Sequence, residues 1–113
     1  MKLSDRGVKL YDSDESAAER RRQFTSGAVP VAVYGLGKMG LPLAGVYASV
    51  SGNVIGVDVD DRVVEQVNAG ESPVEREPGL ADLIERAVET GALRATSDVQ
   101  DAAARASVHV LIV

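Results

Sequence analysis

Cysteine is absent from the sequence, and histidine is nearly absent. Without cysteine, the 113 residues hold no disulfide bond, no thiolate metal site and no thiol nucleophile. The single histidine, His109, is too few for a histidine-based metal site. We therefore expect these residues to bind no metal ion.

Aromatic residues and positive charge are also scarce. Aromatic residues make up 4% of the sequence and tryptophan is absent, which argues against a surface on which nucleic-acid bases stack. Residues 1–30 carry six basic and five acidic side chains, giving +1, whereas residues 31–113 carry six and twelve, giving −6, and the two sum to the net charge of −5. A region with a charge of −6 repels a phosphate backbone. We expect no nucleic-acid partner.

The sequence lacks a long uninterrupted apolar run. Its longest apolar stretch, residues 28–50, contains Lys38 and is broken by glycines and a proline, whereas a membrane-spanning helix needs about 20 apolar residues. Arg21 and Arg22 precede that stretch as in a twin-arginine export signal. Removal of such a signal would also remove the strand and glycine loop described below. These features predict a cytoplasmic protein with no membrane partner.

The apolar residues that are present suffice for one folded domain. Hydrophobic residues make up 45% of the chain and charged residues 26%, which is typical of a globular domain. We divide the chain into an N-terminal extension, residues 1–29, and a domain, residues 30–113. The extension is predicted to hold one short helix over about residues 14–24, capped by Asp12 or Ser13. Its thin apolar face predicts loose docking.

From residue 30 onward, short apolar runs alternate with helical patterns. Strands are predicted at residues 31–34, 53–57, 93–96 and 108–113. Helices are predicted at residues 40–49, 60–69, 78–90 and 98–105. Pro78 is placed at a first helical position, and Ser97 with Gln100 is predicted to form a capping box. The order β-α-β-α-α-β-α-β predicts an α/β fold, a Rossmann-like parallel sheet with flanking helices.

The last predicted strand, residues 108–113, ends the chain without polar residues after it. A native terminus ordinarily trails into polar residues. We therefore expect a truncated first half of a Rossmann-like sheet, with about four strands, and an incomplete domain.

A glycine-rich loop joins the first predicted strand of the domain to its first helix: Gly35-Leu36-Gly37-Lys38-Met39-Gly40. In a strand-to-helix turn of this kind, Gly35 permits the tight turn and Gly37 lets the backbone approach a pyrophosphate, while Gly40 lets helix and strand pack closely. The residues between the glycines then turn backbone N–H groups toward an anion at the positive end of the helix.

An acidic residue completes this pattern. Asp58 ends the second predicted strand and lies 58 − 40 = 18 residues past the third glycine. There a carboxylate can accept both ribose hydroxyls of an adenosine, and it would repel a 2′-phosphate, so NAD is favoured over NADP. The alternative is a glycine-rich turn with Asp58 merely capping the next helix. The loop and the acid together predict a dinucleotide site.

Other polar residues suggest no catalytic group. Glu75 and Glu77 lie close together in the sequence, but no nucleophile accompanies them. Arg62 either reaches the adenosine ribose or is simply exposed. His109 is predicted to be a buried or edge-facing strand residue. We expect no catalytic residue in this chain.

Four stretches beyond the glycine loop carry a family resemblance: Gly56-Val57-Asp58, Val67-Asn68-Ala69-Gly70-Glu71-Ser72-Pro73, Glu77-Pro78-Gly79-Leu80 and Gly91-Ala92-Leu93-Arg94-Ala95-Thr96. With the loop, which continues into Leu41-Pro42, they resemble the UDP-glucose/GDP-mannose dehydrogenase family. The resemblance covers about residues 30–113, and the last stretch is nearest the UDP-N-acetyl-D-mannosamine dehydrogenase branch.

This resemblance implies the NAD-binding portion of an oxidoreductase of polysaccharide biosynthesis. Members oxidise a nucleotide sugar, here of UDP-N-acetylmannosamine or UDP-glucose type, to its uronic acid with NAD. The family's catalytic cysteine and lysine would lie beyond Val113, so the fragment is expected to bind NAD and to catalyse nothing. The complete protein is expected to be a homo-oligomer. The implied NAD contacts are Gly35, Leu36, Gly37, Lys38, Met39, Gly40 and Asp58.

Two other functions remain open from the residues alone. A β-hydroxyacid dehydrogenase carries a similar glycine loop, although the segments at residues 77–80 and 91–96 argue against it. A nucleotide-sensing regulatory Rossmann module, such as those attached to potassium transporters, would carry the same loop and acid without any catalytic cysteine.

Overall fold

Four parallel strands form one sheet in the computed structural model, which describes residues 16–112. The spatial order is β3-β2-β1-β4, so the first strand of the chain lies inside the sheet, and the connection from β3 to β4 passes over β2 and β1 to the opposite edge. This arrangement confirms the predicted Rossmann-like α/β fold. The strands are β1 (Val31–Tyr34), β2 (Val54–Val57), β3 (Leu93–Thr96) and β4 (Val108–Leu111).

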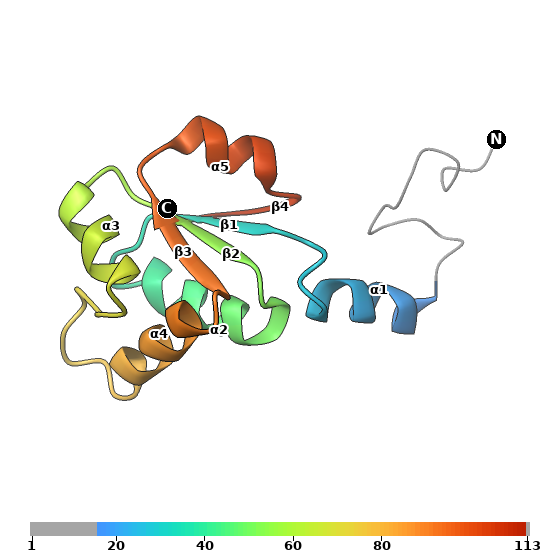
Figure 1. The fold of residues 1–113 in the computed structure, drawn as a ribbon, viewed down its shortest axis with the longest axis horizontal. Helices are drawn as coiled ribbons and strands as arrows, with labels where there is room; N and C mark the ends of the chain where they lie inside the picture. Colours follow the sequence, from blue (N-terminus) through green and yellow to red (C-terminus); the bar gives the residue numbers. More distant parts are fainter. Residues whose placement is uncertain (1–15, 113) are drawn as a thin grey trace.

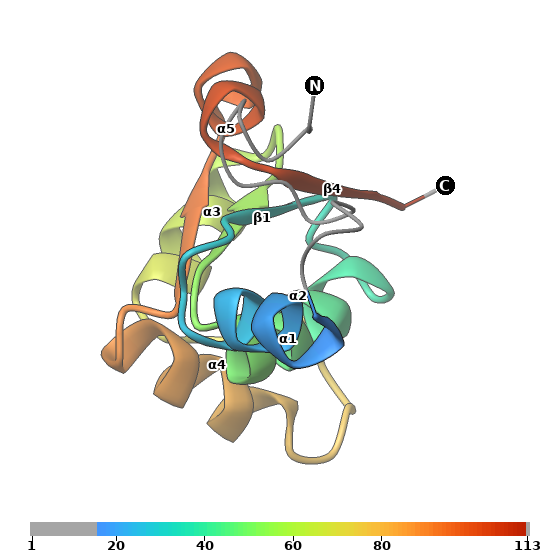
Figure 2. The same cartoon turned by 90° about the vertical axis from the view of Figure 1, so that its right-hand side faces the viewer.

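Helices cover the two faces of the sheet unequally. Helices α2 and α4 lie on one face, with α1 beside α2, and α5 lies alone on the opposite face (Figure 1, Figure 2). Helix α3 packs against the edge strand β3. The helices are α1 (Ala17–Thr25), α2 (Gly40–Ser51), α3 (Asp61–Asn68), α4 (Leu80–Glu89) and α5 (Val99–Arg105). No helix in this part of the chain is long and apolar enough to cross a membrane.

The core fills both sides of the two central strands. On the α2 and α4 side, Val31 and Val33 of β1 are fully buried with the apolar residues of both helices. On the α5 side, Ile55 and Val57 of β2 pack with Ala102 of α5. Both strands are therefore packed on both faces, and they end at the same edge of the sheet. Strand β4 is more open, with Leu111 70% exposed, because it lies at an edge of the sheet.

Two predictions of helix starts on the α2 and α4 side of the sheet needed revision. Helix α1 begins at Ala17, after Ser16, whose hydroxyl accepts a hydrogen bond from the Glu19 N–H. The predicted caps, Asp12 and Ser13, lie outside the described residues. Helix α1 buries no residue, which confirms its thin apolar face. The prediction of Pro78 as a first helical residue was wrong, because a left-handed Gly79 (φ 78°) follows it and α4 begins only at Leu80.

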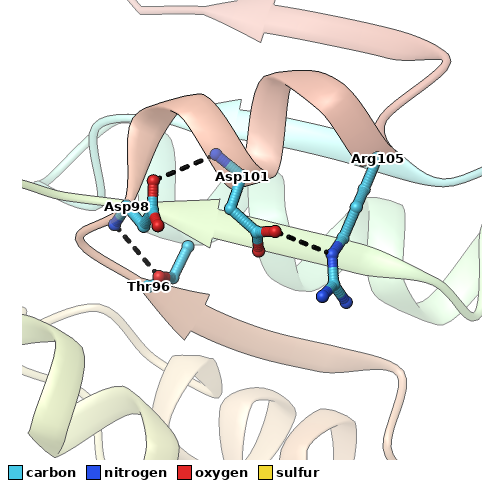
Figure 3. A network of polar contacts seen from close by, with 4 residues as sticks. All are labelled: Thr96, Asp98, Asp101 and Arg105. Carbon is cyan, nitrogen blue, oxygen red and sulfur yellow. Dashed lines mark hydrogen bonds and ion pairs between the residues drawn. The ribbon is translucent and has the colours of Figure 1, made fainter.

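The capping box predicted for α5 was also wrong. The cap is Asp98, whose carboxylate accepts a hydrogen bond from the Asp101 N–H at 3.0 Å. Thr96 Oγ1 accepts from the Asp98 N–H, and Asp101 pairs with Arg105 one turn later (Figure 3). An aspartate caps as well as a serine does, and here it stands one residue further along than Ser97.

The free edge of β3 is closed by a side chain. Asn68, the last residue of α3, donates from Nδ2 to the Ala95 carbonyl at 2.9 Å and accepts from the Ala95 N–H at 2.8 Å. The amide thus pairs with backbone groups at a sheet edge that would otherwise offer itself to another strand.

We predict that Asn68→Ala lowers the free energy of unfolding by about 1–2 kcal/mol, because two hydrogen bonds to the strand are lost. Urea denaturation measures this difference. The control is Gln66→Ala on the same helix. Because this side chain is exposed, its removal should change the free energy of unfolding by less than about 0.5 kcal/mol. Equal losses in the two variants would contradict the role of Asn68.

Candidate functional site

The glycine loop lies where sequence reasoning placed it, between the end of β1 and the start of α2. Gly35 adopts a positive φ of 99° and donates from its N–H to the Val57 carbonyl at 2.7 Å. Leu41 N–H donates to the Gly37 carbonyl, so the loop closes a turn just ahead of α2. The N–H groups at the start of a helix have no partner within it. The loop therefore presents a helix N-terminus at the carboxyl edge of the sheet.

The second and third glycines face opposite steric demands. A Cβ built on Gly40 would lie 1.6 Å from the Gly35 carbonyl oxygen, so no side chain fits there. A Cβ built on Gly37 would meet no atom within 4 Å. Gly40 is thus required by the packing of the loop itself, whereas Gly37 leaves open space that a bound group can enter.

Asp58 ties this loop to the neighbouring strand. Its Oδ2 accepts a hydrogen bond from the Leu36 N–H and its Oδ1 accepts one from the Asp60 N–H, both at 2.9 Å. A carboxylate offers about four acceptor positions, so the two oxygens retain positions for further donors. The Leu36 N–H, which we predicted to face an anion, donates to Asp58 in this structure.

Leu36 anchors the loop from below. Its side chain is 1% exposed and packs on Gly56 in the middle of β2, where an added Cβ would lie 2.8 Å from Leu36 Cδ1. Sequence reasoning quoted Gly56 without giving it a role. A glycine inside an apolar strand signals a close approach, and that signal was present. Lys38 and Met39 are both exposed, Met39 by 68%, so their side chains are directed away from the loop's packed interior.

A hollow of about 200 Å³ adjoins the Asp58 carboxylate. Three of its residues were missed, because they come together only in the fold: Tyr34 ends β1, Val59 follows Asp58, and Val99 opens α5. Val59 is 87% exposed and Val99 45%. The hollow is lined by Tyr34, Gly35, Val57, Asp58, Val59 and Val99.

The remaining candidates lie elsewhere. Arg62 pairs with Asp60 at 3.5 Å and its side chain is 89% exposed. Glu77 lines a larger hollow, of about 400 Å³, between α2 and α4, to which neither the glycine loop nor Asp58 contributes. His109 is exposed on β4, as predicted for an edge-facing strand residue. Within residues 16–112, no cluster of three or more histidine, aspartate or glutamate side chains could hold a metal ion.

Together these features fit the adenosine diphosphate end of a dinucleotide. The open backbone at Gly37 and the helix N-terminus suit a pyrophosphate. The remaining acceptor positions of Asp58 suit ribose hydroxyl groups, and the exposed apolar side chains beside it suit a flat ring.

The chain is similar to known proteins. Residues 29–113 match the model of the UDP-glucose/GDP-mannose dehydrogenase family, NAD binding domain. A UDP-N-acetyl-D-mannosamine dehydrogenase of Salmonella typhi is 45% identical over 59% of this chain and 16% of its own length. A GDP-mannose 6-dehydrogenase of Azotobacter vinelandii is 35% identical over 74% of this chain and 19% of its own.

Solved structures agree with the sequence matches. A GDP-mannose dehydrogenase from Pseudomonas aeruginosa, solved as a ternary complex, superposes with a TM-score of 0.72 at 34% identity, over 75% of this chain and 19% of that one. A UDP-glucose dehydrogenase from Pyrobaculum islandicum gives 0.70 at 30% identity, over 75% and 19%. The chain therefore spans less than a fifth of the length of these relatives.

We predict that Gly40→Ala lowers the free energy of unfolding by about 1–3 kcal/mol or more, because its Cβ overlaps the Gly35 carbonyl. Gly37→Ala, the matched control in the same loop, should stay within about 0.5 kcal/mol of the unsubstituted chain. Thermal or urea unfolding measures both. A stable Gly40→Ala chain would show that the loop is not packed as described.

Proposed function

The chain belongs to the UDP-glucose/GDP-mannose dehydrogenase family, and we propose that it is the NAD-binding part of an enzyme that oxidises a nucleotide sugar to its uronic acid. The observation that carries this proposal is the Asp58 carboxylate, hydrogen-bonded to the backbone of the glycine loop. A carboxylate with free acceptor positions beside an open helix N-terminus supports binding of NAD, which needs an acceptor for its ribose hydroxyls and donors for its pyrophosphate.

We propose that different residues of the site hold the pyrophosphate and the adenosine ribose. Backbone N–H groups at the start of α2 hold the pyrophosphate, with Gly37 giving it room to approach. Asp58 holds the adenosine ribose through acceptor positions that its two backbone partners leave free. Lys38 and Met39 contribute through the backbone. Leu36 contributes by donating its N–H to Asp58 and by its buried side chain, and Gly35 and Gly40 by shaping the loop. When bound, NAD supplies the hydride acceptor for the oxidation.

The chemical step is proposed to use residues outside these 113. This is supported by the length of the relatives, of which the chain matches 16% to 19%, and by the absence of cysteine from the sequence. The substrate is proposed to be a UDP-sugar of N-acetylmannosamine or glucose type; UDP-N-acetyl-D-mannosamine dehydrogenases are among the relatives. We propose residues 30–113 as the NAD-binding domain and residues 1–29 as an extension, in a complete protein that is a cytoplasmic homo-oligomer.

The substrate class can be tested on the complete gene product. UDP-N-acetylmannosamine, UDP-glucose, GDP-mannose and a set of 3-hydroxy acids are each supplied with NAD, and NADH formation is followed. Oxidation of a UDP-sugar supports the proposal, and oxidation of GDP-mannose alone would move the protein to another branch. Oxidation of 3-hydroxy acids alone would favour a β-hydroxyacid dehydrogenase, and binding of NAD without any oxidation would favour a regulatory module.

We predict that Asp58→Asn weakens binding of NAD by about 1–3 kcal/mol, because charged acceptors for the ribose hydroxyls are lost. Binding of NADP should fall less or rise, because the charge that repels a 2′-phosphate is removed. Calorimetric titration gives the ratio of the two affinities, which does not depend on how much of the variant is folded. An unchanged ratio would refute the role of Asp58 at the ribose.

We also predict that Gly37→Ala loses affinity for NAD by on the order of tenfold or more, although the variant folds as well as the unsubstituted chain. The added methyl group enters space that is open in the free chain and that the pyrophosphate would use. The same titration measures the loss. Full affinity in this variant would place the pyrophosphate elsewhere.

A further inference from the structure

Tyr34 is the one aromatic residue that lines the hollow beside Asp58. It ends β1 and packs against the small cluster of Ile55, Val57 and Ala102 beneath α5. Its hydroxyl oxygen lies 2.8 Å from Nδ1 of His109, and the two rings stack with their centroids 5.8 Å apart and their planes inclined by 25°. Tyr34 thus contacts the hollow and His109 together.

His109 reaches Tyr34 from the neighbouring strand. Ala32 pairs with His109 and Tyr34 with Leu111 along the β1–β4 ladder, so Tyr34 and His109 are diagonal neighbours on one face of the sheet. His109 does not line the hollow itself. Any effect of His109 on a group bound there must therefore pass through the Tyr34 ring.

We propose that His109 positions Tyr34 as an aromatic wall of the adenosine end of the site, and so raises the affinity for NAD without touching it. This inference rests on the proposed function, because it takes the hollow beside Asp58 to hold the adenosine. Tyr34 is only half-buried, and the cluster beneath α5 supports its ring on one side. The hydrogen bond and the stacked imidazole restrain it on another.

The gain comes from preorganisation. Immobilising a side chain on binding costs about 0.5–1.5 kcal/mol, and a ring that is already restrained in the free protein avoids most of that cost. Converted into a ratio of dissociation constants, that cost means that loss of the restraint weakens binding about twofold to tenfold. A hydrogen bond between two partly solvated side chains adds little to stability, because water replaces each partner when the chain unfolds. The pair therefore affects binding more than folding.

The test compares Tyr34→Phe, His109→Ala and the double variant of the 113-residue chain. Titrations use NAD and ADP-ribose, which shares the adenosine end but lacks the nicotinamide. Each single variant should bind both ligands about twofold to tenfold more weakly. The double variant should lose no more than His109→Ala alone, because both substitutions break one contact. The control is Val108→Ala, which shortens a partly buried side chain on the opposite face of β4, neither next to Tyr34 nor lining the hollow.

A second readout follows Tyr34 directly. The chain has no tryptophan and three tyrosines, so its intrinsic fluorescence comes from tyrosine. ADP-ribose should change the emission of the unsubstituted chain, and Tyr34→Leu should abolish most of that change while also weakening binding. A variant that was merely less stable would not lose the change in tyrosine emission that ADP-ribose causes.

Two outcomes would overturn the inference and leave the proposed function intact. The first is unchanged affinity in Tyr34→Phe and His109→Ala while Asp58→Asn still shifts the NAD to NADP ratio. The second is an additive loss in the double variant, or an equal loss in Val108→Ala, which would mean that His109 acts only by stabilising β4. Failure of the unsubstituted chain to bind either ligand would instead contradict the proposed function itself.

Discussion

The hydrogen bond from the Leu36 N–H to the Asp58 carboxylate joins the parts of the molecule on which the site depends. It links the loop after β1 to the end of β2, beyond the last rung of the β1–β2 ladder. The same carboxylate accepts the Asp60 N–H, and Asp60 in turn caps α3. One side chain thus sets the relative position of a loop, a strand and a helix. A charged acceptor suits this task, because hydrogen bonds to a carboxylate are stronger than those to a neutral group.

Close packing, in addition to the hydrogen bond to Asp58, holds the glycine loop in place. Leu36 is buried against the bare backbone of Gly56, and Gly40 lets α2 start directly over the Gly35 carbonyl. Neither contact leaves room for a methyl group. The glycines of the loop therefore answer separate demands: two of them satisfy the packing of the free protein, and Gly37 alone is left for a ligand. A fingerprint that looks like one motif in the sequence is a set of independent steric requirements in the fold.

The sequence was most informative where structure is decided locally. Strands at residues 31–34 and 93–96 have the predicted bounds. The first is an apolar run between Pro30 and Gly35, and the second is a short segment that follows the helix-ending Gly91. Helix starts were less certain, because several neighbouring residues can cap and only the path of the chain selects one: Asp98 and not Ser97, Leu80 and not Pro78. Tyr34, Val59 and Val99 could not be assigned to one hollow, since only the order of the strands brings them together.

One end of the proposed site consists of backbone groups and the other of side chains, and this difference decides which substitutions each end tolerates. The pyrophosphate end, as proposed, uses backbone groups, so the exposed side chains of Lys38 and Met39 can vary without changing the N–H groups that the loop presents. The adenosine end, as proposed, uses side chains, and two of them, Tyr34 and Asp58, contact residues that do not line the hollow. Changes distant from the ligand therefore act on the adenosine end through those neighbours. On this proposal, affinity for the adenosine end depends on how well Asp58 and Tyr34 are held before NAD binds.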